Sequence, residues 1–354
     1  MNIEKLTQEA LELLKNLIKT QSFSSEEEGT ATFIENWFNT HDIPFQRQAN
    51  NIWATNKNFK EGKTTLLLNS HHDTVQPNNG YTRDPYSPDI EDGKLYGLGS
   101  NDAGGCLVSL IATFTYFYAY ENPKYNLVLV ASGEEESSGP NGLNSMLKVI
   151  PHIDVAIVGE PTLMNLAIAE KGLVVFDAQV LGTPSHAAHP NDDNAIYNCI
   201  AVLQWFKDFK FEKVSEALGE VKMTVTQIKG GKQHNAVPAD IDLVVDVRVN
   251  DQYSNKEIAD LLQAQAPCDS IKPRSLRLNS SSIPKEHELV KAGIALGRST
   301  YGSPTLSDQA VLSCPSLKLG PGDSTRSHSA DEYIYVKEIE EGIQIYIDLL
   351  ESIL

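Results

Sequence analysis

YNLVLVASGEEE, residues 125–136, is a short apolar run that ends in three adjacent carboxylates. An apolar run of this length without polar alternation is typical of a strand buried on both faces. Three neighbouring carboxylates are difficult to keep ionised together unless cations lie nearby, although a solvated charged turn is the simpler alternative. The stretch therefore predicts a buried strand of an α/β sheet that delivers acidic side chains to a cation-binding site.

Three further apolar runs and one turn also stop at residues of metal-binding type. They are TTLLLNS (64–70) before His71, VAIVG (155–159) before Glu160, SLKLGPG (316–322) before His328, and GLGSN (97–101) before Asp102. In open α/β sheets, ligands bind outside the carboxyl ends of the strands, so we expect these side chains to converge there. Together with the glutamates they are the metal-binding residue types of a hydrolase with two metal ions.

Each of these residues also has a purely structural interpretation. A histidine at a strand end is more often structural than a ligand, Asp102 suits the cap of a helix, and Glu160 suits a turn. It is their combination that favours a metal centre. We prefer His71 to His72, because His71 and Asp73 point the same way along an extended strand. Asp73 can then hold the second nitrogen of the His71 imidazole.

Chain length, charge and cysteine content limit the number of domains, the binding partners and the compartment that we expect. A chain of 354 residues exceeds the size at which one core usually splits into two domains. Its 47 acidic and 29 basic residues give a formal charge of -18, which disfavours binding to nucleic acid or to an anionic membrane. The four cysteines are scattered, and no signal peptide or transmembrane segment is recognisable. We therefore expect a cytoplasmic protein with reduced thiols.

Two patterns of secondary structure divide the chain. The first part alternates expected helices and strands, which indicates an α/β layer with a mostly parallel central sheet flanked by helices. The expected elements there are helices 4–20, 28–40, 102–120 and 140–149 and strands 64–70, 125–132 and 154–159.

A different pattern, β-α-β-β-α-β, begins near residue 171 and is typical of a small α+β domain. Its expected helices span 192–209 and 254–265 and its last strand 274–279, after which the α/β pattern resumes and ends in a helix over 336–353. We predict a discontinuous catalytic domain, 1–170 and 280–354, and an inserted domain, 171–279.

In combination the motifs SHHD (70–73), GEPT (159–162) and LGTPSHAAHP (181–190) resemble those of a known family. It is the family of two-metal (co-catalytic zinc) amidohydrolases and exopeptidases that includes acetylornithine deacetylase, succinyl-diaminopimelate desuccinylase, aminoacylase and carboxypeptidase G. The resemblance covers essentially the whole chain. It implies two divalent metal ions, zinc with cobalt or manganese as alternatives, and a cis peptide bond after Asp102.

The resemblance also implies a role for each residue of the centre. His71 and Glu160 would hold one ion, Glu135 and His328 the other, and Asp102 would bridge the two; Glu134 would be the general base and Asp73 would orient His71.

For the inserted domain the resemblance implies dimerisation of two identical chains. His186 would stabilise the tetrahedral oxyanion, within its own subunit or across the dimer, and Asn235 and Arg248 would contact polar groups of the substrate. Without the resemblance, His186 is a loop histidine and Arg248 an exposed strand residue. Arg326, close to His328, is a further candidate contact for the acyl group or the far end of the substrate.

The C-terminal stretch GPGDSTRSHSADEYI (320–334) resembles the deacetylase branch of the family. The chain departs from the family pattern at 103–105, Ala-Gly-Gly where Met-Lys-Gly is frequent, and at Ser137, where glycine is frequent. These departures affect loop shape and specificity and leave the ligand types intact.

The implied activity is metal-dependent hydrolysis of the N-acyl amide of a small amino-acid derivative. The resemblance favours N-acetylornithine deacetylase of arginine biosynthesis, or a variant for N-acetylcitrulline or N-succinylornithine. Succinyl-diaminopimelate desuccinylase and a di- or tripeptidase are the alternatives. A non-catalytic binding protein is disfavoured because every implied ligand and the implied base are present.

Overall fold

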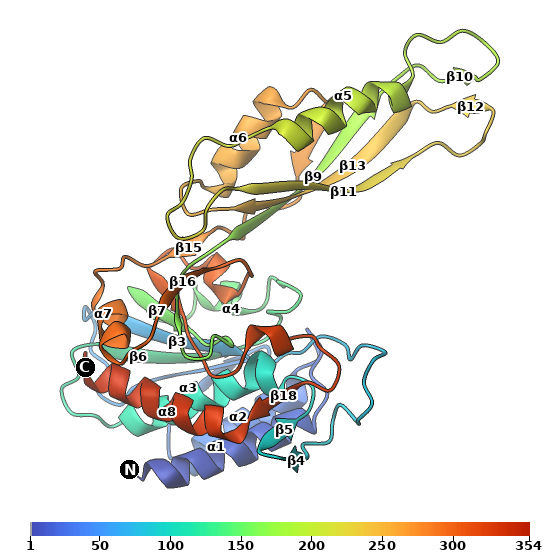
Figure 1. Ribbon diagram of the computed structural model, residues 1–354. Helices are drawn as coiled ribbons and strands as arrows, with labels where there is room; N and C mark the ends of the chain where they lie inside the picture. The colour runs from blue at the N-terminus through green and yellow to red at the C-terminus, as the bar shows by residue number, and fades with distance from the viewer. Residues whose placement is uncertain (1) are drawn as a thin grey trace. The chain divides into compact units, whose positions relative to one another are not determined.

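The computed structural model describes residues 2–354, which form two compact units. The first unit comprises the described residues up to Ile168, Ser282–Tyr301 and Ser307–Leu354, and the second comprises Ala169–Ser281 and Gly302–Leu306. The ribbon diagram labels their helices and strands (Figure 1).

The first unit is built on a mixed sheet with strand order β1-β2-β6-β3-β7-β17-β8-β15, in which β16 also pairs with β8. Strands β6, β3, β7 and β17 are mutually parallel, whereas β1, β2 and β8 add antiparallel pairs at the two sides. The expected α/β sheet is confirmed, and its parallel part is confined to these central strands. The strands are β1 (Gln46–Gln48), β2 (Asn51–Thr55), β3 (Thr65–His71), β6 (Asn126–Ser132), β7 (Val155–Val158), β8 (Leu166–Glu170), β15 (Ser281–Ser282), β16 (Thr300–Ser303) and β17 (Ser316–Lys318).

Both faces of this sheet are covered, because its central strands are apolar on both sides. Along β3, Leu66 and Leu68 join the larger core, whereas Leu67 joins a smaller core on the opposite face. The larger core is shared by helices α1 (Ile3–Ile18), α2 (Glu28–Thr40), α3 (Gly105–Phe117), α7 (Glu288–Ala295) and α8 (Val336–Glu351), and the smaller one by α4 (Leu143–Met146). A small separate sheet contains β4 (Ile90–Glu91), β5 (Lys94–Tyr96) and β18 (Tyr333–Tyr335).

Helix α3 is apolar around its whole circumference and is almost entirely buried, as expected for a helix between a sheet and other helices. It begins at Gly105, three residues later than the sequence predicts, because Asp102 has non-helical dihedral angles (φ -118°, ψ 99°). Residues Ser100–Gly104 form a separate short turn of π-helix. Asp102 is therefore not the cap of α3.

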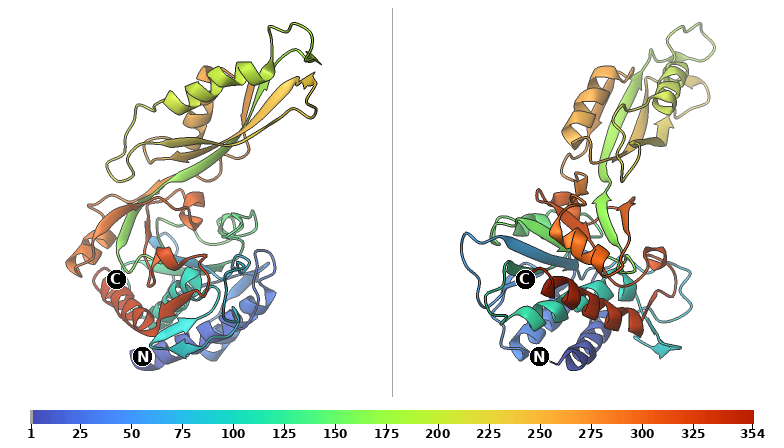
Figure 2. Two further views of the ribbon diagram at one scale, coloured as in Figure 1. Left: turned by 45° about the vertical axis from the view of Figure 1, so that its right-hand side comes forward. Right: turned by 60° about the vertical axis from the view of Figure 1, so that its left-hand side comes forward.

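The second unit is an antiparallel sheet with strand order β11-β13-β9-β14. Alternate side chains of β9 and β13 pack against helices α5 and α6, which lie on the same face of this sheet (Figure 2). The elements follow the expected order, but the last strand lies at 270–273 and not at 274–279. They are β9 (Gly172–Leu181), β10 (Ser185–His186), α5 (Ala195–Asp208), β11 (Lys222–Gly230), β12 (Ala236–Val237), β13 (Asp240–Val249), α6 (Asn255–Gln265) and β14 (Ser270–Pro273).

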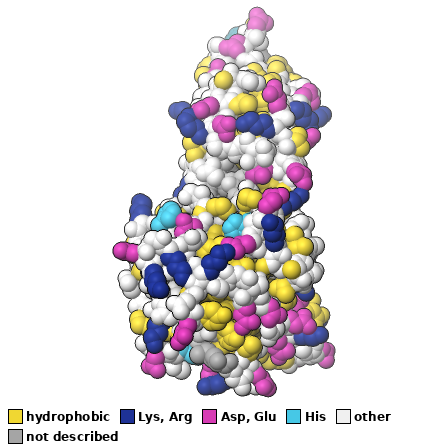
Figure 3. Space-filling view, turned by 90° about the vertical axis from the view of Figure 1, so that its left-hand side faces the viewer, with side chains coloured by type: hydrophobic (Ala, Val, Ile, Leu, Met, Phe, Trp, Pro, Cys, Tyr) yellow, Lys and Arg dark blue, Asp and Glu magenta, His cyan; other side chains and the backbone are white. Residues whose placement is uncertain are grey.

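Among the helices of residues 2–354, none is long and apolar enough to cross a membrane. Acidic and basic side chains are interspersed on the face shown in Figure 3, so the excess negative charge of the chain does not segregate there into one patch.

Candidate metal centre

The carboxyl ends of the central strands bring four of the expected side chains together. His71 is the last residue of β3, the glutamates 134–136 follow β6, and Glu160 follows β7. The Nε2 atom of His71 lies 3.3 Å from Asp102 Oδ1, 3.8 Å from Glu160 Oε1 and 3.9 Å from Glu135 Oε2. These distances are too long for a set of good hydrogen bonds and suit a space in which several ligand atoms face one cation.

The ring of His71 presents one nitrogen to this space. Its Nδ1 lies 3.0 Å from the backbone carbonyl oxygen of Asp73 and 3.3 Å from the Asp73 carboxylate. A carbonyl oxygen only accepts hydrogen bonds, so Nδ1 carries a proton and Nε2 of the neutral ring has the lone pair. Within residues 2–354, this Nε2 is buried and has no hydrogen-bond partner. A buried lone pair without a donor fits a metal ligand.

His72 has no such nitrogen to offer. Its Nδ1 lies 2.8 Å from Thr30 Oγ1 and its Nε2 lies 2.9 Å from the carbonyl oxygen of Asn50. Both ring nitrogens are therefore engaged in hydrogen bonds inside the protein, and the geometry favours His71 over His72 as a ligand.

Asp102 lies between the two histidines. Its Oδ1 is 3.3 Å from His71 Nε2, and its Oδ2 is 3.7 Å from His328 Nε2. The peptide bond from Asp102 to Ala103 is cis, as the family resemblance implies. One carboxylate that turns one oxygen to each imidazole has the arrangement required of a ligand shared by two ions.

The three adjacent glutamates point to different places. Glu134, with φ +56°, turns back on its own loop: its carboxylate accepts hydrogen bonds of 3.0 Å from Asn141 N, Asn141 Nδ2 and Ser25 Oγ. Glu135 faces His71, and Glu136 lies 3.0 Å from His328 Nε2. The possible metal-binding groups in the described residues are His71, Asp102 and Glu136, and His71, Glu135 and Glu160.

The expected roles of this triplet are the base for Glu134 and a metal ligand for Glu135. In the structure the Glu134 carboxylate accepts hydrogen bonds from Asn141, whereas Glu135 and Glu136 each belong to a possible metal-binding group with His71. The three side chains therefore point in different directions, and their roles stay predictions. The physical reason is that β6 ends at Ser132, so the alternation of a strand no longer sets the side-chain directions beyond it.

Asp73 organises the turn that carries these glutamates. Its Oδ1 accepts a hydrogen bond from the backbone N–H of Glu135 (3.1 Å), and its Oδ2 accepts from Glu136 N (3.1 Å) and Ser24 Oγ (2.7 Å). Asp73 thus contacts His71 and also holds two amides that direct Glu135 and Glu136. Only the first of these contacts is anticipated by the sequence.

The electrostatics of the cluster favour bound cations. Burial lowers the pKa of His71, but the carboxylates of Asp102, Asp73 and Glu135 outweigh burial and raise it well above its usual range. A hydrogen bond to Glu136 raises the pKa of His328 to about 9. Burial, with a further contribution from Glu160, raises the pKa of Glu135. The cluster therefore holds more negative charge than its own imidazoles offset, and divalent cations would compensate it.

Two acidic residues near the cluster are absent from the predicted site. Asp308 accepts a 2.6 Å hydrogen bond from Ser132 Oγ, and burial raises its pKa to about 6. Glu332 is 1% exposed, and burial followed by the charge of Asp102 raises its pKa to about 8. Neither follows an apolar strand run, which is the signal that identifies the other carboxylates.

Arg326, expected as a contact for the substrate, is paired within the protein. Its Nη1 and Nη2 donate to the two carboxylate oxygens of Glu338 at 2.7 and 2.8 Å, and its guanidinium lies over the rings of Tyr333 and Tyr335. The side chain is only 14% exposed. The forked end is therefore occupied by an internal carboxylate, and a role of Arg326 as a substrate contact stays a prediction.

His186, Asn235 and Arg248 belong to the second unit. His186 lies on β10 and pairs with Ala236 of β12, and Ala187 N donates to the carbonyl oxygen of Asn235 (3.0 Å), so Asn235, in the turn before β12, lies beside the strand that carries His186. Arg248 lies near the far end of β13 and donates to Asp246 through Nε (2.9 Å) and Nη2 (3.2 Å). The unit therefore groups His186 with Asn235 and not with Arg248.

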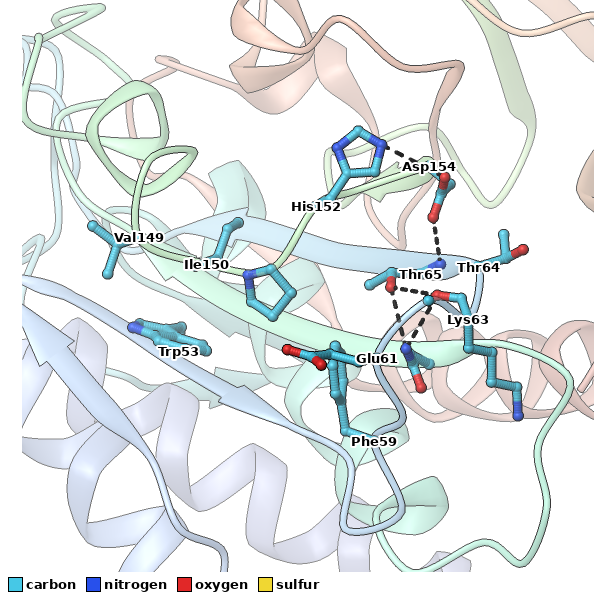
Figure 4. A pocket seen from close by; sticks show the side chains of 13 residues that line it. Trp53, Phe59, Glu61, Lys63, Thr64, Thr65, Val149, Ile150, His152 and Asp154 are labelled. Carbon is cyan, nitrogen blue, oxygen red and sulfur yellow. Dashed lines mark hydrogen bonds and ion pairs between the residues drawn. The ribbon is translucent and has the colours of Figure 1, made fainter.

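A pocket of about 540 Å³ lies in the first unit, at the amino ends of β3 and β6 (Figure 4). Its polar groups bind one another: Asp154 Oδ2 accepts from Thr65 N at 2.8 Å, and Asn126 Nδ2 donates to the carbonyl oxygens of Lys60 (2.8 Å) and Lys63 (3.2 Å). The metal-binding cluster lies at the opposite, carboxyl ends of the same strands, so this pocket is a separate feature.

Comparisons with known proteins agree with this architecture. A sequence model of "Peptidase family M20/M25/M40" matches residues 67–352. Acetylornithine deacetylase of Shigella sonnei (strain Ss046) is 27% identical over 372 residues, which cover 96% of each chain. Succinyl-diaminopimelate desuccinylase of Wigglesworthia glossinidia brevipalpis is 30% identical over 267 residues, which cover 70% of each chain.

Solved structures share the fold at lower identity. Aminopeptidase PepT from Bacillus cereus superposes with a TM-score of 0.75 at 16% identity and covers 100% of this chain and 99% of its own. A dinuclear metal-binding peptidase of the M20 family from Bacillus subtilis gives a TM-score of 0.76 at 12% identity, with 99% of each chain covered. At these identities the likeness establishes the fold.

Proposed function

The chain belongs to peptidase family M20/M25/M40 and is a metallo-hydrolase, and from this premise we propose that it removes the acyl group from an N-acyl amino acid. N-acetylornithine is the substrate we propose first, with N-acetylcitrulline and N-succinylornithine as close variants. The observation that carries this choice is the similarity to an acetylornithine deacetylase along 96% of both chains. The product would then serve arginine biosynthesis.

The proposed ligands follow the geometry of the cluster. His71 and Glu160 would hold one cation, His328 and Glu136 the other, and Asp102 would contribute one oxygen to each. Imidazole and carboxylate donors suit zinc, and also cobalt or manganese. The buried lone pair of His71 and the excess of carboxylates support this assignment.

Two cations bound there would lower the pKa of a shared water and polarise the carbonyl of the scissile amide. Glu135 faces His71 and belongs to a possible metal-binding group; in this proposal it would serve as the base that accepts a proton from the attacking water. It would return that proton to the leaving nitrogen, so that one water and one amide yield a carboxylate and an amine. His186 would stabilise the oxyanion with its imidazole, as the family resemblance implies.

The second unit offers a surface for a second copy of the chain. Strand β11 is an outer strand of its sheet, and within the described chain only β13 pairs with it. Helix α5 exposes Ile196, Tyr197 and Ile200, which are 46%, 69% and 63% exposed and lie within about one turn of the helix. An unpaired strand edge beside exposed apolar side chains favours association, so we propose a homodimer formed through this unit.

We also propose that the enzyme works in the cytoplasm. All four cysteines have free thiols, which suits a reducing compartment.

Succinyl-diaminopimelate desuccinylase remains the second candidate, because that relative is 30% identical, although over only 70% of the chains. The same residues would catalyse both reactions, so the difference lies in the acyl group and side chain that are recognised.

The decisive experiment measures amine release by metal-loaded protein from N-acetylornithine, N-acetylcitrulline, N-succinylornithine, succinyl-diaminopimelate and small peptides. We expect the highest kcat/KM for an ornithine or citrulline derivative. A preference for succinyl-diaminopimelate or for peptides would overturn the proposed substrate. The Glu135→Gln variant controls for contaminating hydrolases, because it should be inactive on every substrate.

A further inference from the structure

We propose that Glu332 is a positioning residue of the metal centre, which holds the backbone before Asp102 so that the Asp102 carboxylate faces both histidines. This inference rests on the proposed two-metal site. Glu332 belongs to the loop that follows His328 and is 1% exposed. No role in the reaction has been assigned to it above.

The contacts of Glu332 converge on one short segment. Its Oε1 accepts hydrogen bonds of 2.9 Å from the backbone N–H groups of Asn101 and Asp102, and its Oε2 accepts one of 3.3 Å from Gly99 N. Its own carbonyl oxygen accepts a 2.9 Å hydrogen bond from Gly97 N. Glu332 alone thus accepts hydrogen bonds from four backbone N–H groups in the six-residue segment 97–102.

These amides need an external acceptor because the segment is not a regular helix. Gly99 has φ +73°, and Asp102 has the extended angles φ -118° and ψ 99°. Amides at the start of a helix have no acceptor within the helix, and a buried amide without a partner costs about 1–3 kcal/mol. A carboxylate accepts several such bonds at once, whereas a neutral amide side chain offers one oxygen and one donor.

The position of this segment determines where the Asp102 carboxylate lies. Its two oxygens are 3.3 Å from His71 Nε2 and 3.7 Å from His328 Nε2, so a shift of the backbone alters both distances together. Residues that orient a ligand affect metal binding almost as strongly as the ligands themselves. Since both oxygens of Glu332 already accept hydrogen bonds from amides, Glu332 acts through Asp102 and is not proposed as a ligand.

Loss of a terminal ligand and misplacement of a bridging ligand should affect the binding of the two cations differently. Loss of a terminal ligand such as Glu136 removes contacts to one cation. Misplacement of Asp102 weakens both cations at once. The comparison of two binding events therefore distinguishes a positioning role for Glu332 from a local effect on one ion.

The experiment titrates metal-free full-length protein with Co²⁺ or Zn²⁺ by isothermal calorimetry and records the melting temperature of each metal-free variant. In Glu332→Gln, the carbonyl oxygen replaces one carboxylate oxygen and an NH₂ group faces the remaining amides. We expect both binding events to weaken by about 10- to 100-fold. In Glu136→Gln only one event should weaken.

The matched control is Asp331→Asn: this neighbouring carboxylate accepts hydrogen bonds from Thr82 and Arg83 and, within residues 2–354, makes none with a proposed ligand. The metal affinities of its two binding events should remain within about threefold of wild type, because the substitution lies outside the network of ligands. If Glu332→Gln does not fold, Glu332→Asp is titrated instead, because it keeps the charge and shortens the reach.

The outcomes separate this inference from the proposed function. The positioning role of Glu332 is supported if the wild-type protein shows two metal-binding events and both have lower affinity in the Glu332 variant. A folded Glu332 variant that binds both ions as wild type does, or that loses only one, overturns it, and so does unfolding of both Glu332 variants. A wild-type protein that binds fewer than two ions would instead refute the two-metal proposal itself.

Discussion

Replacing each of the three adjacent glutamates with glutamine, one at a time, tests the proposed roles of Glu134, Glu135 and Glu136. Each substitution keeps the size of the side chain and removes its charge. In Glu135→Gln no carboxylate remains to accept the proton of water, and loss of a general base lowers kcat by about 10²- to 10⁴-fold. Both metal ions should still bind, because Glu135 is not among the proposed ligands.

Glu134→Gln should behave differently. Its carboxylate accepts three hydrogen bonds, from Asn141 N, Asn141 Nδ2 and Ser25 Oγ. Glutamine keeps one acceptor and turns a donor towards the rest, so about 2 kcal/mol of stability should be lost. That loss corresponds to a melting temperature lower by roughly 4–8 °C. Because the carboxylate points away from the cluster, kcat should stay within a few-fold of wild type.

Glu136→Gln completes the series. Its carboxylate lies 3.0 Å from His328 Nε2, so this variant should lose one of two metal ions and activity with it. The assay combines kcat for amine release, metal content by mass spectrometry, and the melting temperature. The reasoning would be refuted by a Glu134→Gln protein that folds, binds both metals and has a kcat more than about 10²-fold below wild type. That result would identify Glu134 as the general base.

Three further outcomes are expected. His71→Asn should lose one metal ion, whereas His72→Asn should keep both and lower stability by about 1–3 kcal/mol, because its two hydrogen bonds are internal; metal content and melting separate them. Arg326→Met should lower the melting temperature and leave KM unchanged, since it breaks a largely buried pair with Glu338; a raised KM would restore Arg326 as a substrate contact. Hydrogen bonds lower the pKa of Glu257 to about 2, below the roughly 4.3 of an unfolded chain, so its stabilisation is present above about pH 4 and is lost as the pH falls towards 2. The melting difference between wild type and Glu257→Gln should therefore shrink across that range, and a constant difference would contradict it.

The residues that end apolar strands could be predicted from the sequence. An uninterrupted run such as 64–70 predicts a strand with both faces buried, and the carboxyl ends of parallel strands meet at one edge. His71 and Glu160 follow directly from that rule, and the structure brings them to 3.8 Å. The boundaries of the helices were less predictable: α4 spans four residues where a helix over 140–149 was expected.

Residues whose roles depend on distant partners were not predictable in this way. Arg326 has the charge and position of a substrate contact in the sequence, but its partner Glu338 and the rings above it become neighbours only in the folded chain. Glu332 likewise has no local pattern, because its hydrogen-bonded amides lie more than 200 residues away in the chain.

The sequence by itself determined the α/β class, the chemistry of the centre and the strands that supply it, because apolar periodicity and residue type are local properties. Tertiary structure alone decided the direction in which each of three identical neighbouring glutamates points. Beyond the end of β6 the backbone leaves the strand, and Asp73 and Asn141, from other turns, hold the direction of each side chain. Three equal residues in succession contain no local signal for that direction, which depends on hydrogen bonds formed only when distant segments meet.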